Sequence, residues 1–93
     1  MGYIFEWDLK KATLNALKHG VTFDEASTAF GDSLALLMPD PDHSVDEERY
    51  ILLGGSERQR LLVVAFAERP PRTRLISARR ATRRERRSYE EEG

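Results

Sequence analysis

The sequence contains no cysteine, so it can form neither a disulfide framework nor a thiolate metal site. It also has no apolar run of the ~20 residues that a membrane-spanning helix needs, and its N-terminus lacks the charged-then-apolar pattern of a signal sequence. We therefore predict a soluble, cytoplasmic protein. Its 93 residues suit a single domain, residues 1–93, that folds without covalent or metal cross-links.

Several motifs of known chemistry are missing as well. The GxxxxGK[ST], GxGxxG and HExxH patterns are absent, and no serine lies in an elbow motif that would indicate a serine-based triad. What remains is chemistry on a phosphodiester without a metal or other cofactor. In RNA the 2′-hydroxyl is itself the nucleophile, so a protein needs only a proton acceptor, a proton donor and cations around the developing phosphorane charge.

Charge is divided strongly along the chain, although the net charge is only −1. Residues 1–68 carry six basic and twelve acidic side chains, net −6, whereas residues 69–93 carry nine basic and four acidic ones, net +5. A localised basic region of this kind is typical of proteins that bind polyanions.

Most of that basic charge lies in residues 73–92, TRLISARRATRRERRSYEEE, which contain seven arginines and no lysine. Residues 73–78 predict a short strand. Thr82 and Glu85 have the spacing of a capping box, which predicts a helix beginning near Arg83. Because Tyr89 is its only large apolar side chain, this helix must lie on the surface. It is either a solvated charged helix or a phosphate site; the absence of lysine favours the second, since arginine binds phosphate oxygens bidentately.

The first part of the chain predicts a strand at residues 3–7 followed by a helix. Asp8 is the expected N-cap and Gly20 the end of this helix. Three- and four-residue steps predict an apolar stripe of Leu9, Ala12, Ala16 and Leu17, with Leu14 on its flank. Lys18 and His19 in the last turn complement the helix dipole or, alternatively, contact RNA, and His19 could also be a catalytic imidazole.

A second helix and four strands are predicted next. Thr22 and Glu25 repeat the capping-box spacing, which indicates a helix through Phe30. Strands are expected at residues 34–38, 50–56, 61–68 and 73–78, the last three as an antiparallel meander with residues 61–68 in the middle of the sheet. The predicted fold class is α+β: a small antiparallel or mixed sheet with two N-terminal helices on one face and a basic C-terminal helix.

Residues 40–48 form a predicted loop with five carboxylates around His43. These side chains could suit a divalent cation, but their spacing matches no calcium-binding loop and lacks the expected glycine. A solvated acidic loop is therefore favoured, and no metal is expected.

Six segments resemble the BrnT family of bacterial toxins: EWD (6–8), KHGVTFDEA (18–26), FGD (30–32), EERY (47–50), LLVV (61–64) and RLISARRATRRERRSYEE (74–91). The resemblance covers nearly the whole chain in order. It departs at Arg80, where a lysine is expected, and at the turn of residues 69–72, which is stiffer than the expected Gly-Asp turn. That family is similar to the RelE/ParE-like toxins, which implies a small sheet flanked by helices. The order predicted from the residues, strand, two helices, four strands and helix, is RelE-like.

The resemblance implies a metal-independent endoribonuclease that inhibits translation. It also implies a partner: a DNA-binding antitoxin of ribbon-helix-helix type, BrnA-like, in a 2:2 complex that binds operator DNA and autoregulates the operon. The competing class is a non-catalytic module that binds nucleic acid or forms an obligate complex, and it would bind RNA without cleaving it.

The resemblance places the active face on the sheet surface that the first two helices leave uncovered. Arg79 and Arg74 are the candidate transition-state cations. Glu68 and Tyr89 are candidates for proton transfer, although Glu68 could instead pair with Arg69 or Arg74 and Tyr89 could anchor its helix. Contacts with RNA are expected from Lys18, His19, Arg80, Arg83, Arg84 and Arg87.

Overall fold

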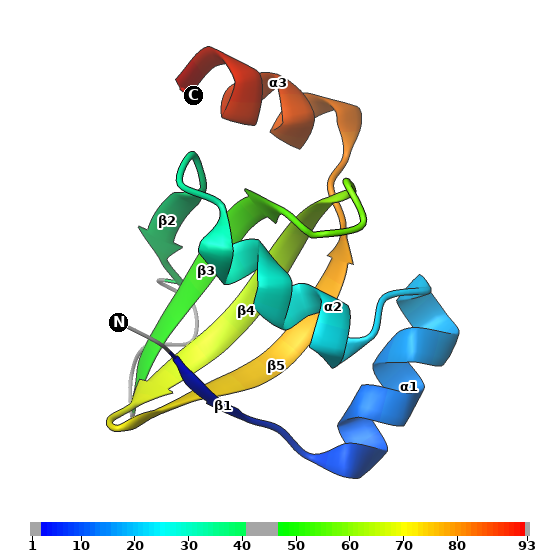
Figure 1. Cartoon of the computed structure of the whole chain (residues 1–93), viewed down its shortest axis with the longest axis vertical. Coiled ribbons are helices and arrows are strands. Elements are labelled where there is room, and N and C mark those ends of the chain that lie inside the picture. The colour runs from blue at the N-terminus through cyan, green and yellow to red at the C-terminus, as the bar shows by residue number, and fades with distance from the viewer. Residues whose placement is uncertain (1–2, 41–46, 93) are drawn as a thin grey trace.

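A five-stranded mixed sheet forms the centre of the computed structural model, which describes residues 3–40 and 47–92 (Figure 1). Its strands are β1 (Ile4–Glu6), β2 (Leu36–Pro39), β3 (Glu48–Gly55), β4 (Leu61–Arg69) and β5 (Arg72–Arg80), in the order β1-β5-β4-β3-β2. β1 pairs with β5 in parallel, and all other pairs are antiparallel. The predicted α+β class, the antiparallel meander and the central place of 61–68 are confirmed.

Three α-helices and one 3-10 turn complete the fold: α1 (Leu9–His19), α2 (Phe23–Thr28), η1 (Ala29–Gly31) and α3 (Arg83–Glu92). Local sequence signals fix their ends. The Asp8 carboxylate accepts a hydrogen bond from the Lys11 amide at 3.0 Å, and Gly20, with φ of 68°, ends α1. The second helix stops two residues earlier than predicted and continues as η1. Among the described residues, no helix is long and apolar enough to cross a membrane.

The hydrophobic core lies between α2 and one face of the sheet, and Figure 1 shows α2 lying across that face with α1 beside β5. Alternate residues of the central strands point into the core, as β-strand geometry requires. Aromatic rings extend it, since Phe30 packs edge-to-face on Phe5 and Phe66 with ring centroids 4.9 and 5.0 Å apart. The core residues are Val21, Phe23, Ala26, Ala29, Leu52, Leu62, Val64, Phe66, Leu75 and Ala78.

The predicted apolar stripe of α1 is confirmed at Ala12, which packs against the core, and is wrong at its leucines. Leu9 and Leu17 are 78% and 79% exposed, and Leu14 is also exposed, whereas Asn15 is buried at 7% exposure. The Asn15 amide nitrogen donates to the carbonyl oxygens of Ala78 (2.8 Å) and Val21 (2.9 Å), and its oxygen accepts from the Ala78 amide (3.1 Å). The reason is that α1 packs beside the edge of a strand, where backbone groups need polar partners, rather than on an apolar sheet face.

Asn15 therefore takes the place of a neighbouring strand. β1 pairs only with residues 72–74 of β5, so the edge of β5 is without a strand partner beyond that point. By donating to and accepting from one residue of β5, the Asn15 side chain reproduces the two hydrogen bonds that a paired strand would make.

Candidate active site and RNA-binding face

The face of the sheet that α1 and α2 leave uncovered, which we call the helix-free face, contains a row of residues that ends at Arg79. Strand register places Leu36, Leu53, Val63 and Arg79 side by side across four strands. Val63 alternates along β4 with the core residues on either side of it, so this row points away from α2. The resemblance implied an active face on this side of the sheet, and Arg79 lies on it.

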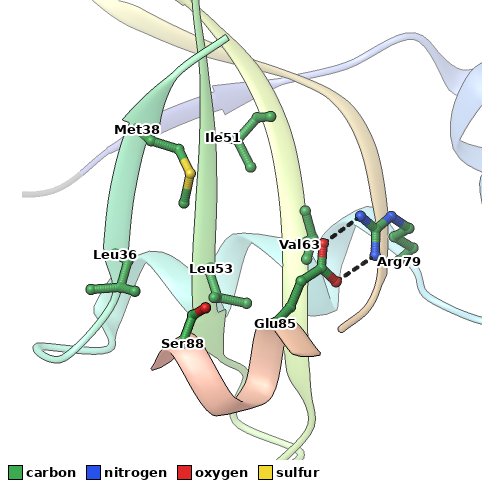
Figure 2. Close-up of a pocket in the computed structure, with 8 residues that line it drawn as sticks. All are labelled: Leu36, Met38, Ile51, Leu53, Val63, Arg79, Glu85 and Ser88. Carbon is green, nitrogen blue, oxygen red and sulfur yellow. Dashed lines mark hydrogen bonds and ion pairs between the residues drawn. The ribbon is translucent and has the colours of Figure 1, made fainter. Parts of the chain in front are cut away.

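A groove with an apolar floor lies on this face, and we name it the α3 groove. Figure 2 shows the floor formed by side chains of β2, β3 and β4, with Glu85 and Ser88 of α3 at one end and Arg79 facing Glu85. Its volume is about 250 Å³. The groove combines apolar surface with one cation at its rim, and its lining residues are Leu36, Met38, Ile51, Leu53, Val63, Arg79, Glu85 and Ser88.

Arg79 and Glu85 form a two-pronged ion pair. The two terminal guanidinium nitrogens of Arg79 lie 2.9 and 2.8 Å from Oε1 and Oε2 of Glu85. Hydrogen bonds from Arg79 lower the pKa of Glu85 to about 2, and the same contact raises the pKa of Arg79. The Arg79 side chain remains 41% exposed. A guanidinium fork that holds two carboxylate oxygens in this way can hold two phosphate oxygens in the same geometry.

The sequence predicted the capping role of Glu85 but not its ion pair with Arg79. Its carboxylate accepts the Thr82 amide at 2.8 Å while the Thr82 hydroxyl accepts the Glu85 amide at 3.2 Å, so the predicted capping box forms. The cap directs the carboxylate back toward the end of β5, where it meets Arg79. A capping glutamate six residues after an arginine, across a strand-to-helix turn, is the signal that could have indicated this pair.

A second polar contact fastens the other end of α3. The Tyr89 hydroxyl donates to Oδ2 of Asp32 at 2.6 Å, and this hydrogen bond raises the pKa of Tyr89. Asp32 also accepts from the amides of Gly55 and Leu34. Since no residue of α3 is buried, these polar contacts hold the helix in place. Tyr89 thus anchors its helix, and it does not line the α3 groove.

Glu68 is distant from Arg79. It pairs across the sheet with Thr73, whose hydroxyl donates to it at 3.0 Å. It lies five residues along β4 from Val63, the neighbour of Arg79, which corresponds to about 17 Å and to the opposite face. The structure does not bring these two predicted residues into one site. The alternative pairing of Glu68 with Arg69 or Arg74 is wrong, because those arginines contact Glu47 and Glu6 respectively.

Arg74 lies on the same face as Arg79 but further along the sheet. It pairs in register with Ala67, four residues from Val63, which corresponds to about 13 Å. Its guanidinium lies 3.4 Å from the Glu6 carboxylate, and about a third of the side chain is exposed. Arg74 can therefore meet a substrate that extends along the face from Arg79.

The remaining predicted contacts fall into two groups. Arg80, Arg83, Arg84 and Arg87 are exposed at the end of β5 and on α3, and within residues 3–40 and 47–92 they form no ion pair. Lys18 and His19 lie at the end of α1, beside Ile76 and Ser77 of β5. Arg79 is thus neutralised by its own chain, while the arginines of α3 form no ion pair among the described residues. Arg80 pairs in register with the core residue Leu62, so it points to the opposite face from Arg79.

The acidic loop predicted at residues 40–48 lies mostly outside the described residues, because residues 41–46, which include His43, are not described. The prediction that it binds no metal therefore stays a prediction. Among the residues that are described, no group of three or more His, Asp or Glu side chains could hold a metal ion.

Comparison with known proteins shows both a family and a similar fold. Residues 7–85 match the family described as ribonuclease toxin, BrnT, of type II toxin-antitoxin system. The matched segment includes Arg74, Arg79 and Glu85 and ends before Tyr89. No curated protein matches the sequence. The fold is similar to that of the Brucella abortus ribonuclease toxin BrnT, solved by crystallography, with a TM-score of 0.67 and 23% identity over 89% of this chain and 100% of that one.

Proposed function

Because this chain belongs to the BrnT family of ribonuclease toxins of type II toxin-antitoxin systems, we propose that it cleaves RNA with Arg79 as the cation that stabilises the transition state. The observation that carries this proposal is the fork of Arg79, which holds two carboxylate oxygens at the rim of a groove on the helix-free face. In this proposal a substrate phosphate displaces the Glu85 carboxylate from Arg79 and gains the same two hydrogen bonds.

The proposed reaction needs no group from outside the RNA and the protein. The 2′-oxygen forms a bond to the adjacent phosphorus, the bond from phosphorus to the 5′-oxygen breaks, one proton leaves the 2′-hydroxyl and one joins the departing 5′-oxygen. The products are a 2′,3′-cyclic phosphate and a 5′-hydroxyl. Negative charge grows on the phosphorane oxygens in between, and Arg79 stabilises it. Arg74 serves as a second cation along the face, and Arg83, Arg84 and Arg87 bind flanking phosphates, whereas an RNA contact by Arg80, on the opposite face, stays a prediction.

Proton transfer by Glu68 and Tyr89 stays a prediction. Both side chains already have structural partners, Thr73 for Glu68 and Asp32 for Tyr89. Glu85 is the carboxylate next to Arg79, but a pKa of about 2 makes it a weak proton acceptor near neutral pH. The proposal therefore assigns most of the rate enhancement to electrostatic stabilisation and not to general-base catalysis.

Substitution of Arg79 tests this proposal. We expect Arg79→Ala to lower the rate of RNA cleavage by about 100- to 1,000-fold, as the loss of one oxyanion donor does. Arg86→Ala is the matched control, because it removes the same charge from exposed α3 outside the α3 groove. Circular dichroism must show that both variants fold. Equal, small losses in the two variants would refute the role of Arg79, and RNA binding without any cleavage by the wild type would favour the non-catalytic alternative.

We further propose that the α3 groove is where the antitoxin acts. An apolar side chain of the partner fills the floor, and a carboxylate beside it competes with Glu85 for Arg79. The expected partner is a ribbon-helix-helix protein of the BrnA type, which is dimeric and would carry two toxins onto operator DNA and repress its own operon.

Co-expression with the neighbouring gene tests this part. A tag on the partner should recover a complex with the mass of two toxins and two antitoxins, which binds operator DNA and does not cleave RNA. Leu53→Arg, which puts a charge in the groove floor, should prevent recovery, while the exposed Leu17→Arg should not. A complex that cleaves RNA at the full rate would exclude masking of this face as the means of control.

A further inference from the structure

Helix α1 presents a polar stripe to β5. Lys11, Asn15 and Lys18 follow one another at steps of four and three residues, so they lie along one line of the helix, with His19 beside them. Asn15, in the middle, is fixed to Ala78 by two hydrogen bonds of 2.8 and 3.1 Å. The two lysines are therefore held on either side of a rigid attachment, next to the edge of β5.

A shallow hollow of about 220 Å³ lies between this stripe and β5. We name it the α1 hollow; Asn15 closes it at the β5 edge, and its other lining residues are Lys11, Leu14, Lys18, His19, Ile76 and Ser77. Ser77 is exposed and pairs in register with Ala65, which puts it on the same face as Arg79. Two residues of strand separate Ser77 from Arg79, which corresponds to about 7 Å. That distance is about one step between successive phosphates of an extended RNA strand.

The lysines of the α1 hollow are not held in ion pairs with described residues, although the Asp8 carboxylate at the start of the helix interacts electrostatically with Lys11. Helix α1 contains no acidic residue, and within the described ranges neither Lys11 nor Lys18 forms an ion pair. Other cations near the sheet differ, since Arg60, Arg74 and Arg79 pair with glutamates. The helix dipole accounts for Lys18 and His19 in the last turn but not for Lys11, which lies in the first turn, where the dipole disfavours a cation.

We propose that Lys11, Lys18 and Ser77 form a subsite for the RNA phosphate adjacent to the one that Arg79 binds. This rests on the proposed function and deepens it. The two ammonium groups supply charge and the Ser77 hydroxyl donates a hydrogen bond to a phosphate oxygen, while Leu14 and Ile76 offer apolar contact to the sugar. Asn15 fastens α1 to the edge of β5, and the lysines on either side of it give the same polar stripe a binding role.

Binding of a single-stranded 2′-O-methyl RNA tests the subsite, because this probe lacks the nucleophile and cannot be cleaved. The matched pair of variants is Lys11→Ala and Lys10→Ala, which remove the same charge from neighbouring positions of one helix, only the first of which lines the hollow. We expect Lys11→Ala to lower the slope of log affinity against log salt by about 0.7 and Lys10→Ala to leave it nearly unchanged. Lys11→Ala/Lys18→Ala should weaken binding by about five- to tenfold, and Lys11→Arg/Lys18→Arg should restore most of it.

A neutral methylphosphonate moved along the probe one linkage at a time locates the contact. At one linkage, the methylphosphonate should weaken binding of the probe by the wild type. At that linkage the wild type and Lys11→Ala/Lys18→Ala should then bind the probe with the same affinity. Equal effects of Lys10→Ala and Lys11→Ala, or a difference that persists at every linkage, would overturn the subsite. Absence of cleavage of unmodified RNA by the wild type would count against the proposed function alone, since the binding assay does not depend on cleavage.

Discussion

Replacing Asn15 by alanine should destabilise the protein far more than removing any leucine of the same helix. The substitution deletes three hydrogen bonds and leaves the backbone groups of Ala78 and the carbonyl of Val21 without partners. At about 1 kcal/mol for each lost bond, the free energy of unfolding should fall by about 3 kcal/mol. For a domain of this size that corresponds to a fall in Tm of about 12 to 24 °C.

Urea unfolding followed by the fluorescence of Trp7, the single tryptophan, measures this loss. Leu17→Ala is the control and should change the free energy of unfolding by less than about 0.5 kcal/mol, because the side chain is exposed. Asn15→Asp keeps the shape but places a carboxylate against two carbonyls. That raises its pKa in the folded state, so this variant should lose stability as the pH rises above about 4, the ordinary value of aspartate. A loss in Asn15→Ala no larger than in Leu17→Ala would refute the role of Asn15 as a strand substitute.

Three further outcomes are expected. Glu85→Gln should lower the free energy of unfolding by about 1 kcal/mol at pH 7. Because the pKa of Glu85 in the folded state is lowered to about 2, this stabilisation is complete above the ordinary glutamate pKa and is lost as the pH falls through about 2. The acid unfolding curves of variant and wild type should therefore meet near pH 2. Arg60→Ala removes the counterion of the buried Glu25 carboxylate, which keeps, among the described residues, only the hydrogen bond from Ser56, and should destabilise the protein. Hydrogen bonding to Arg60 lowers the pKa of Glu25, so this cost should shrink on acidification below the ordinary glutamate value, and a pH-independent cost would contradict it. Excess EDTA should leave RNA cleavage unchanged, because guanidinium groups stabilise the charge; activity lost to EDTA and restored by Mg²⁺ would be evidence against this.

The parts of the fold that could be predicted from the sequence are those fixed by neighbouring residues. The side-chain caps at Asp8 and Thr82 accept from backbone amides only three residues away, and the hairpins depend on adjacent apolar runs. The orientation of α1 could not be predicted in this way. Its buried residue is Asn15, whose partner Ala78 is 63 residues away, and only the assembled sheet reveals that an edge there needs a donor and an acceptor.

The candidate site, like the fold, could be predicted from the sequence only in part. Arg79 was predicted from its place between a strand and a basic helix, and it does lie on the helix-free face. Glu68 is separated by an odd number of residues from Val63, so the alternation of β4 alone places it on the other face. Arg74 and Arg79 are also five residues apart, yet they share a face, because β5 is irregular near Ile76, where the register with β4 shifts. No local pattern marks that irregularity.

The parallel pairing of β1 with β5 has a consequence for the time at which this protein becomes complete during synthesis. Residues 4–6 cannot pair until residues 72–74 have been made, and Asn15 cannot form its hydrogen bonds to β5 until Ala78 has been made. Arg79 and the α3 residues that close the groove come later still. Pairings so distant in sequence also slow folding once the chain is available. On the ribosome the sheet therefore stays unfinished until β5 has been made, and the groove first forms once α3 has followed it.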